Sequence, residues 1–174
     1  MSVIAALKGY RTQFLYSLHY ILLNLSENFI YRLEGEEDLD ILNSEGQILY
    51  AIQLKNLGKT ITLSDLLSEH KTSFIKRFLE KYSSAIPILV SYGEISKDLK
   101  AWNEHKDKID VKEKNTLKKY KITEDDWKLV KNKIQFSEVN ERTIADEIEK
   151  MMKNHFPLID PIRKAFKASS STFL

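Results

Sequence analysis

The stretch LEGEEDLDILNSEGQILYAIQLKN, residues 33–56, contains two strand patterns joined by a turn signal. In residues 38–42 acidic and apolar side chains alternate, which is the period of a strand with one buried face. Residues 43–46 are turn formers, and Gly46 can take the positive φ that such turns require. Residues 47–55 have the composition of the next strand. Because the connection is short, the two strands are predicted to form an antiparallel hairpin.

Two features of this stretch are unfavourable for a stable fold. Five carboxylates fall within seven residues, where they repel one another: Glu34, Glu36, Glu37, Asp38 and Asp40. At the other end, Lys55 lies on a buried-looking strand, where a lysine must be paired or desolvated. Local departures of this kind are expected at functional sites.

The predicted hairpin register brings three polar side chains together. Side chains alternate along a strand, so Asp38 and Asp40 share one face of the first strand, and Gln53 and Lys55 share one face of the second. A register centred on the turn puts Asp38 near Ala51 to Gln53. We therefore expect Asp38, Gln53 and Lys55 to lie close together.

The flanking sequence predicts further elements. They are a helix at 10–25, a strand at 28–34, a helical region at 58–82 and a strand at 85–93. The helical region can be capped by Thr62 or Ser64, and its apolar spacing slips near 69–72, which predicts a bend or two shorter helices. The strand at 85–93 is a continuous apolar run, typical of a central buried strand. The expected order is α-β-β-β-α-β, an α/β fold with a mixed sheet flanked by helices.

After Gly93 the composition changes. From 97 to 133 there are 12 lysines and 8 acids, a local excess of 12 − 8 = +4. Helices are expected at 123–130 and 141–156, with one more strand at 133–139. The lysines are either a solvated helical face or a track for a DNA backbone. Three aromatic residues of this region are expected in the core rather than in stacking roles: Trp102, Tyr120 and Trp127.

Length and composition indicate one domain. The chain has 174 residues, 43% hydrophobic and 30% charged, with a net charge of +2. We expect a single domain over 1–168, with its core at 8–93, a lysine-rich helical extension with a last strand and helix at 94–168, and a tail or linker at 169–174. There are no cysteines, which excludes disulfides and thiol nucleophiles. No membrane or targeting segment is visible, so a cytoplasmic protein is expected.

The predicted cluster suits metal-assisted phosphodiester cleavage. Mg²⁺ needs few oxygen ligands from a protein, so the Asp38 carboxylate and the Gln53 oxygen can suffice. Lys55 can steady a water or the charge that develops on the phosphate. Asp40 shares the face of Asp38 and is an alternative ligand, and Glu34 is a further candidate. Glu36 is interpreted as surface charge.

These residues also carry a family resemblance. The element order, with Asp38 before one strand and Gln-Leu-Lys at 53–55 on the next, resembles the PD-(D/E)xK restriction-endonuclease-like superfamily. Residues 8–92 look more narrowly like the nuclease domain of the CD-NTase-associated DNA endonucleases of bacterial anti-phage defence. The matching positions are Gly9 with Gln13, Glu37 with Asp38 and Leu39, and Gln53 with Lys55. The superfamily usually has Glu or Asp where Gln53 stands, whereas the narrower family uses Gln.

The resemblance implies a function. It implies an endonuclease that depends on Mg²⁺, or on Mn²⁺, and cleaves double-stranded DNA with little sequence preference. In this interpretation Gln13 orients the site from the first helix. The chain would be the N-terminal effector domain of a longer anti-phage defence protein that forms a homo-oligomer through a sensor or ATPase region. The alternatives are a catalytically silent nuclease-like domain that serves DNA binding or assembly, and an interaction domain without a role on nucleic acid.

Overall fold

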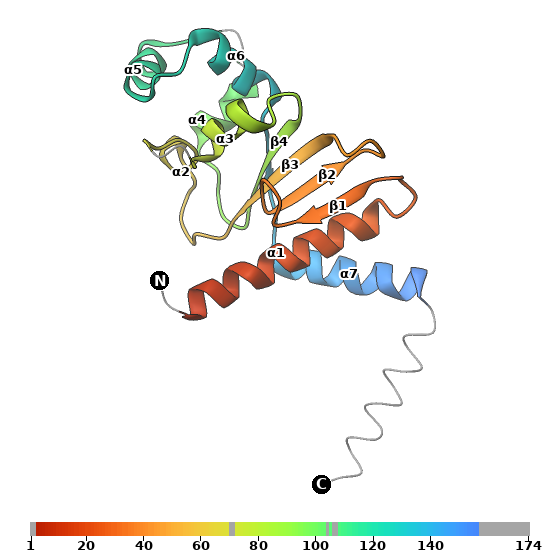
Figure 1. The fold of residues 1–174 in the computed structure, drawn as a ribbon. Helices are drawn as coiled ribbons and strands as arrows, with labels where there is room; N and C mark the ends of the chain where they lie inside the picture. Colours follow the sequence, from red (N-terminus) through yellow and green to blue (C-terminus); the bar gives the residue numbers. More distant parts are fainter. Residues whose placement is uncertain (1–2, 70–71, 104, 106–107, 157–174) are drawn as a thin grey trace, which may run out of the picture.

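The fold is built on a five-stranded mixed sheet (Figure 1). The computed structural model describes residues 3–69, 72–103, 105 and 108–156. The strands lie side by side in the order in which they occur along the chain: β1 (Ile30–Leu33), β2 (Leu39–Leu42), β3 (Ile48–Lys55), β4 (Ile86–Ser91) and β5 (Gln135–Glu138). The predicted α/β class and mixed sheet are confirmed, and so are all five predicted strands, with small shifts at their ends.

The hairpin of β2 and β3 forms as the turn signal predicts. The strands are antiparallel, with Asp40 opposite Ala51 and Leu39 opposite Ile52. Gly46 in the turn has a φ of +79°, a conformation that a side chain would strain. Continued by one residue, the register puts Asp38 opposite Gln53, just before β2 begins. Two of the three residues of the predicted cluster are therefore cross-strand neighbours.

The other half of the sheet is parallel. β4 pairs with both β3 and β5, so it is the inner strand of three parallel strands. Five of its six residues are buried, which explains its continuous apolar sequence. The carboxyl ends of these strands lie together at one edge of the sheet.

Helices cover both faces of the sheet (Figure 1). Their bounds are α1 (Val3–Leu23), α2 (Leu63–Leu66), α3 (Phe74–Lys81), α4 (Lys97–Lys100), the 3-10 helix η1 (Ala101–Asn103), α5 (Val111–Tyr120), α6 (Glu124–Lys133) and α7 (Glu141–His155). The first helix begins seven residues before the predicted start at position 10. The region 58–82 forms two short helices, α2 and α3, as the slip in apolar spacing predicted. Thr62, one of the two predicted caps, is the N-cap of α2.

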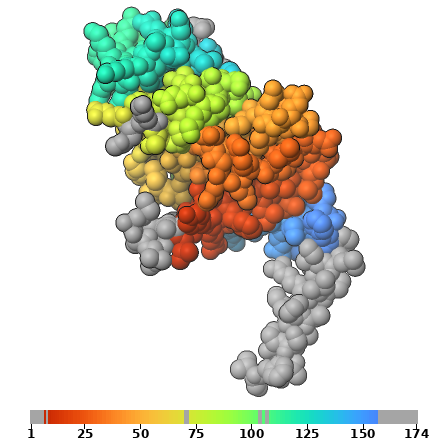
Figure 2. Space-filling view, in the orientation of Figure 1, coloured from red at the N-terminus to blue at the C-terminus, as the bar shows by residue number. Residues whose placement is uncertain are grey.

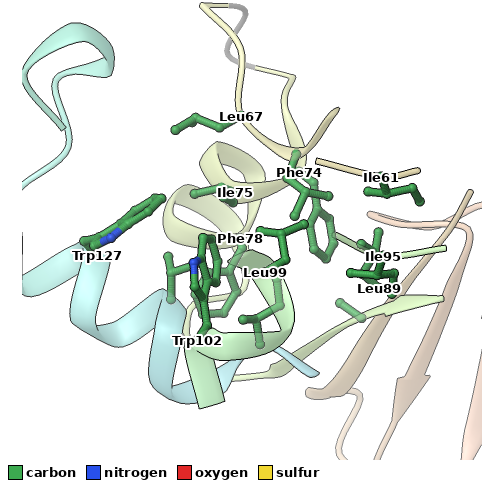
Figure 3. Packing of buried hydrophobic residues seen from close by; sticks show 14 of the residues in the cluster. Ile61, Leu67, Phe74, Ile75, Phe78, Leu89, Ile95, Leu99, Trp102 and Trp127 are labelled. Atoms are coloured by element: carbon green, nitrogen blue, oxygen red, sulfur yellow. The ribbon is translucent and has the colours of Figure 1, made fainter. Parts of the chain in front are cut away.

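The larger core lies between the sheet and helices α2 to α6 (Figure 3). Phe78 of α3 and Trp127 of α6 are almost fully buried there, and Trp102 packs edge-on against Trp127 with ring centroids 5.1 Å apart. Burying such a side chain contributes several kcal/mol to stability. The two tryptophans are core residues, as predicted, and Tyr120 is partly buried against the same core.

The opposite face of the sheet is covered by α1 and α7, which run side by side (Figure 1). Ile144 and Ile148 of α7 pack with Tyr16 and Leu22 of α1 over the apolar side chains of β2, β3 and β4. An ion pair and a hydrogen bond cross between the helices: the Arg11–Glu141 ion pair at 2.9 Å and the His19–Glu147 hydrogen bond at 2.6 Å. The end of the described chain therefore stabilises its beginning.

The lysine-rich segment forms one end of the molecule. Figure 2 shows α5 and α6 at one end and α7 near the other. Helices α5 and α6 are not only a solvated surface, because Leu117 of α5 and Val130 of α6 belong to the larger core. The expected tail at 169–174 and the predicted domain limit at 168 lie outside the described residues. Among the residues that the structure describes, no helix has the length and apolar character needed to cross a membrane.

Candidate functional site

The acidic loop between β1 and β2 is folded around Asp40. The Asp40 side chain is fully buried and accepts two hydrogen bonds from the Arg32 guanidinium, at 2.7 and 3.1 Å. It also accepts the backbone N–H groups of Glu36 and Glu37, at 2.8 and 3.2 Å. Four donors and one full positive charge compensate this carboxylate. Asp40 therefore has a structural partner for its charge, and it holds the loop against β1 and β2.

Asp38 lies at the end of the same loop in a different environment. Its Oδ1 atom accepts a hydrogen bond from Gln13 Nε2 of α1 at 2.7 Å. Its Oδ2 atom accepts the backbone N–H of Leu54 at 2.6 Å and Gln53 Nε2 at 3.3 Å. All three donors are neutral, so Asp38 has no cationic partner among the described residues.

Gln53 connects Asp38 to a second charged group. Its Nε2 atom donates to Asp38, and its Oε1 atom accepts a hydrogen bond from Arg77 of α3 at 3.2 Å. This orientation of the amide satisfies both neighbours, since a carboxylate only accepts and a guanidinium only donates. Gln53 therefore links the hairpin to the helix that covers its polar end.

A buried acid and arginine complete this group. Arg77 binds Glu37 through two hydrogen bonds, Nε to Oε1 at 2.8 Å and Nη2 to Oε2 at 2.6 Å. The Glu37 side chain is fully buried and also accepts the Tyr82 hydroxyl. Burial raises the pKa of the Glu37 carboxyl, although the hydrogen bonds from Arg77 and Tyr82 lower it. Burial and the neighbouring Glu37 raise the pKa of the Tyr82 hydroxyl.

Arg77 and Tyr82 were not predicted from the sequence, and Glu37 was predicted only as part of a motif. These two residues lie 40 and 45 positions from Glu37. No spacing rule links them to the hairpin. The available signal was an arginine and, five residues later, a tyrosine in a segment that also carries Lys76, Glu80 and Lys81, and this signal is weak by itself.

The cluster opens into a cavity of about 480 Å³. Its lining comes from α1, the acidic loop, β3 and α3: Gly9, Tyr10, Gln13, Glu34, Gly35, Glu36, Glu37, Asp38, Gln53 and Arg77. Four of the six predicted site residues thus meet in one cavity, namely Gln13, Glu34, Asp38 and Gln53. Glu34 is exposed and has a φ of +49°.

Two predicted site residues are absent from this lining. Asp40 is bound to Arg32 behind the loop. Lys55 is partly buried at the end of β3, two residues after Gln53, and its ammonium group has no hydrogen bond or ion pair with the residues that the structure describes. Glu36 forms an ion pair with Lys81 at 2.7 Å, in accord with a surface position.

The oxygen atoms of the cavity fit a hard cation. Each carboxylate oxygen has two acceptor positions, so Asp38 Oδ1 retains one beside its bond from Gln13. Glu34 adds a carboxylate, whereas the Gln53 amide oxygen is bound to Arg77 and would reach a cation at Asp38 only after the amide turns. Mg²⁺ needs only one or two carboxylates because it keeps several waters. Within the described ranges there is no group of three or more His, Cys, Asp or Glu side chains suited to a metal. Any cation here would therefore depend on amide oxygens and water as well.

Comparison of the chain with protein-family models, with curated proteins and with solved structures gives no match.

Proposed function

We propose that the chain is a metal-dependent nuclease domain. One observation carries the proposal: Asp38 is held by three neutral donors in a cavity and faces the Gln53 amide across the hairpin. A carboxylate placed among neutral donors, beside a second oxygen-bearing side chain, is suited to a cation from solution. The resemblance of the sequence to the restriction-endonuclease-like superfamily is a second reason for the proposal, and the order α1, β1, β2, β3, α2, α3, β4 has two short helices in place of the single helix of the expected α-β-β-β-α-β order.

Each side chain of the cavity has a role in this proposal. Asp38 and the Gln53 oxygen would hold Mg²⁺ or Mn²⁺, with Glu34 as a further ligand, whereas Asp40 is buried against Arg32 and stays outside the metal site. When bound, the cation lowers the pKa of an attacking water and neutralises phosphate charge. Gln13 holds the Asp38 carboxylate in place through its 2.7 Å bond. Lys55, which is unpaired among the described residues, would bind the phosphate at the end of the same strand.

The proposed substrate is double-stranded DNA. The lysine excess of residues 97–133 can contribute contacts to the phosphate backbone without reading sequence. By resemblance, the chain would act as the N-terminal effector domain of a bacterial anti-phage defence protein. A sensor or ATPase region beyond this segment would then assemble it into a homo-oligomer.

Cleavage of linear and plasmid DNA tests this function directly. We expect cleavage with Mg²⁺ and none with EDTA. Lys55→Ala and Asp38→Ala should each lower the rate about 100-fold or more, the usual loss when a group that stabilises the transition state is removed. Lys150→Ala on α7 is the matched control, because it removes an exposed lysine far along the chain from the hairpin. The protein should also be assayed as a fusion to an oligomeric scaffold, since activity can require assembly.

The other outcomes separate the alternatives. DNA retention that weakens with salt, without cleavage in either assembly state, would favour a silent DNA-binding domain. Absence of both cleavage and retention would contradict a role on DNA.

A further inference from the structure

The Gln53 amide is turned with its oxygen away from Asp38. Gln53 Oε1 accepts from Arg77 Nη2 at 3.2 Å, and Gln53 Nε2 donates to Asp38 Oδ2 at 3.3 Å. Arginine has only donors and an ionised carboxylate has only acceptors. If the amide were reversed, its NH₂ group would face the Arg77 N–H and its oxygen would face the Asp38 carboxylate, and both hydrogen bonds would be lost. With Arg77 in this position, the amide oxygen is unavailable to a cation bound at Asp38.

Arg77 is itself firmly held. Its guanidinium makes the two-bond pair with the buried Glu37, and its third nitrogen, Nη1, donates to the Thr72 carbonyl. A planar guanidinium bound at three points keeps the direction of each N–H. The Nη2 atom is therefore directed at both Glu37 and Gln53, and the side chain is only 20% exposed.

We propose that Arg77 is a positioning residue that competes with the divalent cation for the oxygen of Gln53. This proposal rests on the proposed metal site. Cation binding by Asp38 together with Gln53 requires the amide to turn, which breaks the Arg77–Gln53 bond. Arg77 thereby weakens cation binding and makes it depend on release of that bond. The Glu37–Arg77–Tyr82 group then has a role in the site as well as in stability.

A double-mutant cycle on Mn²⁺ affinity tests this competition. Arg77→Met alone would leave Glu37 buried without a partner and can prevent folding. All four proteins therefore carry Glu37→Gln, whose amide oxygen can still accept from Tyr82. The four are Glu37→Gln alone, with Arg77→Met, with Gln53→Leu, and with both. Mn²⁺ dissociation constants are measured by electron paramagnetic resonance after circular dichroism has shown that each protein is folded.

Competition for the amide predicts a result that simple charge repulsion does not. Arg77→Met should tighten Mn²⁺ binding about 10-fold or more when Gln53 is present, the effect expected for a lost charge-assisted hydrogen bond. In the Gln53→Leu background only the long-range charge effect remains, so the gain should be much smaller. Equal gains in the two backgrounds would overturn the positioning role and leave the metal site intact. Absence of Mn²⁺ binding in the wild type and all four variants would overturn both proposals.

A measurement on the unaltered chain is independent of whether the variants fold. The Gln53 side-chain amide signal in a ¹⁵N nuclear magnetic resonance spectrum is identified by its loss in Gln53→Leu. The backbone amide of Leu54, which donates to Asp38, reports cation binding at that carboxylate. On Mg²⁺ titration we expect both signals to move with the same midpoint. Movement of Leu54 with a stationary Gln53 side chain would overturn the proposal, and two stationary signals would also contradict the metal site.

Discussion

The crowded acids of residues 34–40 are stabilised in three different ways. Glu37 and Asp40 are buried and paired with arginine, Arg77 and Arg32 respectively. Glu34 remains exposed and Glu36 binds a surface lysine. Asp38 differs because its three donors are neutral. The repulsion that the sequence suggests is therefore largely removed by arginines, and Asp38 is the half-buried carboxylate left without a cation in the described part of the chain.

Gly35 is required by this arrangement for reasons of space. A Cβ atom at Gly35 would collide with the Asp40 carboxylate and the Arg32 guanidinium. Gly35→Ala should therefore disrupt the hydrogen bonds that compensate the buried Asp40 carboxylate and lower the free energy of unfolding by about 2–4 kcal/mol. Gly9→Ala is the matched control, because a Cβ there meets no atom within 4 Å and alanine favours a helix by up to about 1 kcal/mol. Urea denaturation measures both, and equal stabilities would contradict the proposed contact.

The meeting of Asp38 with Gln53 could be predicted at the level of residues, because alternation and a short turn determine cross-strand neighbours. Arg32 lies directly opposite Asp40 in the antiparallel β1–β2 pair, so the same cross-strand rule applies to that ion pair. The role of Arg77 could not be predicted, because Arg77 reaches Glu37 from a helix 40 residues later. Such a contact depends on how the elements pack, which no local pattern encodes. Packing also decides which residues line the cavity, and Lys55 is not among them although its face of β3 was predicted.

At the scale of elements, α5 and α6 are joined by a buried ion pair. Lys131 is only 2% exposed, and its ammonium donates to Glu113 Oε1 at 2.9 Å and to the Lys108 carbonyl at 2.8 Å. Glu113 also accepts the indole N–H of Trp127 and, in the capping box of α5, the backbone N–H of Asp110. One of the lysines that composition assigns to a solvated face is thus a core residue.

Glu113→Ala should destabilise the protein more than the loss of an exposed acid. It leaves the Lys131 charge buried without its partner and removes part of the α5 cap, so we expect a loss of about 3–5 kcal/mol in the free energy of unfolding. Glu124→Ala removes an exposed acid in the first turn of α6, where the helix dipole is worth at most about 1 kcal/mol. Thermal melts followed by circular dichroism compare the two. A similar loss in both variants would show that the Lys131–Glu113 pair contributes little.

At the scale of the whole molecule, one sheet separates two cores built from different parts of the chain. The core under α2 to α6 contains both tryptophans, and the core under α1 and α7 contains none. The order of the strands and of the helices outside residues 94–122 could be predicted, since strands alternate with a period of two and amphipathic helices with a period of 3.6 residues. Within 94–122 only a general helical tendency could be predicted. The packing of α7 on α1 could not, because the apolar faces of two distant amphipathic helices do not specify their partner.

Because the sheet is shared, the two cores should unfold together. Ile144 of α7 is 3% exposed in the core that lacks tryptophan. Ile144→Ala should cost about 2–5 kcal/mol, and the exposed-site substitution Asp146→Ala on the same helix is the control. In urea, the circular dichroism and tryptophan fluorescence transitions of Ile144→Ala should shift to the same new midpoint. The reason is that β3 and β4 contribute side chains both to the α1–α7 core and to the core that contains the tryptophans. A fluorescence transition that stays at the wild-type midpoint while the circular dichroism transition moves would mean that the tryptophan core folds without α7, and the chain would then contain two independently stable units.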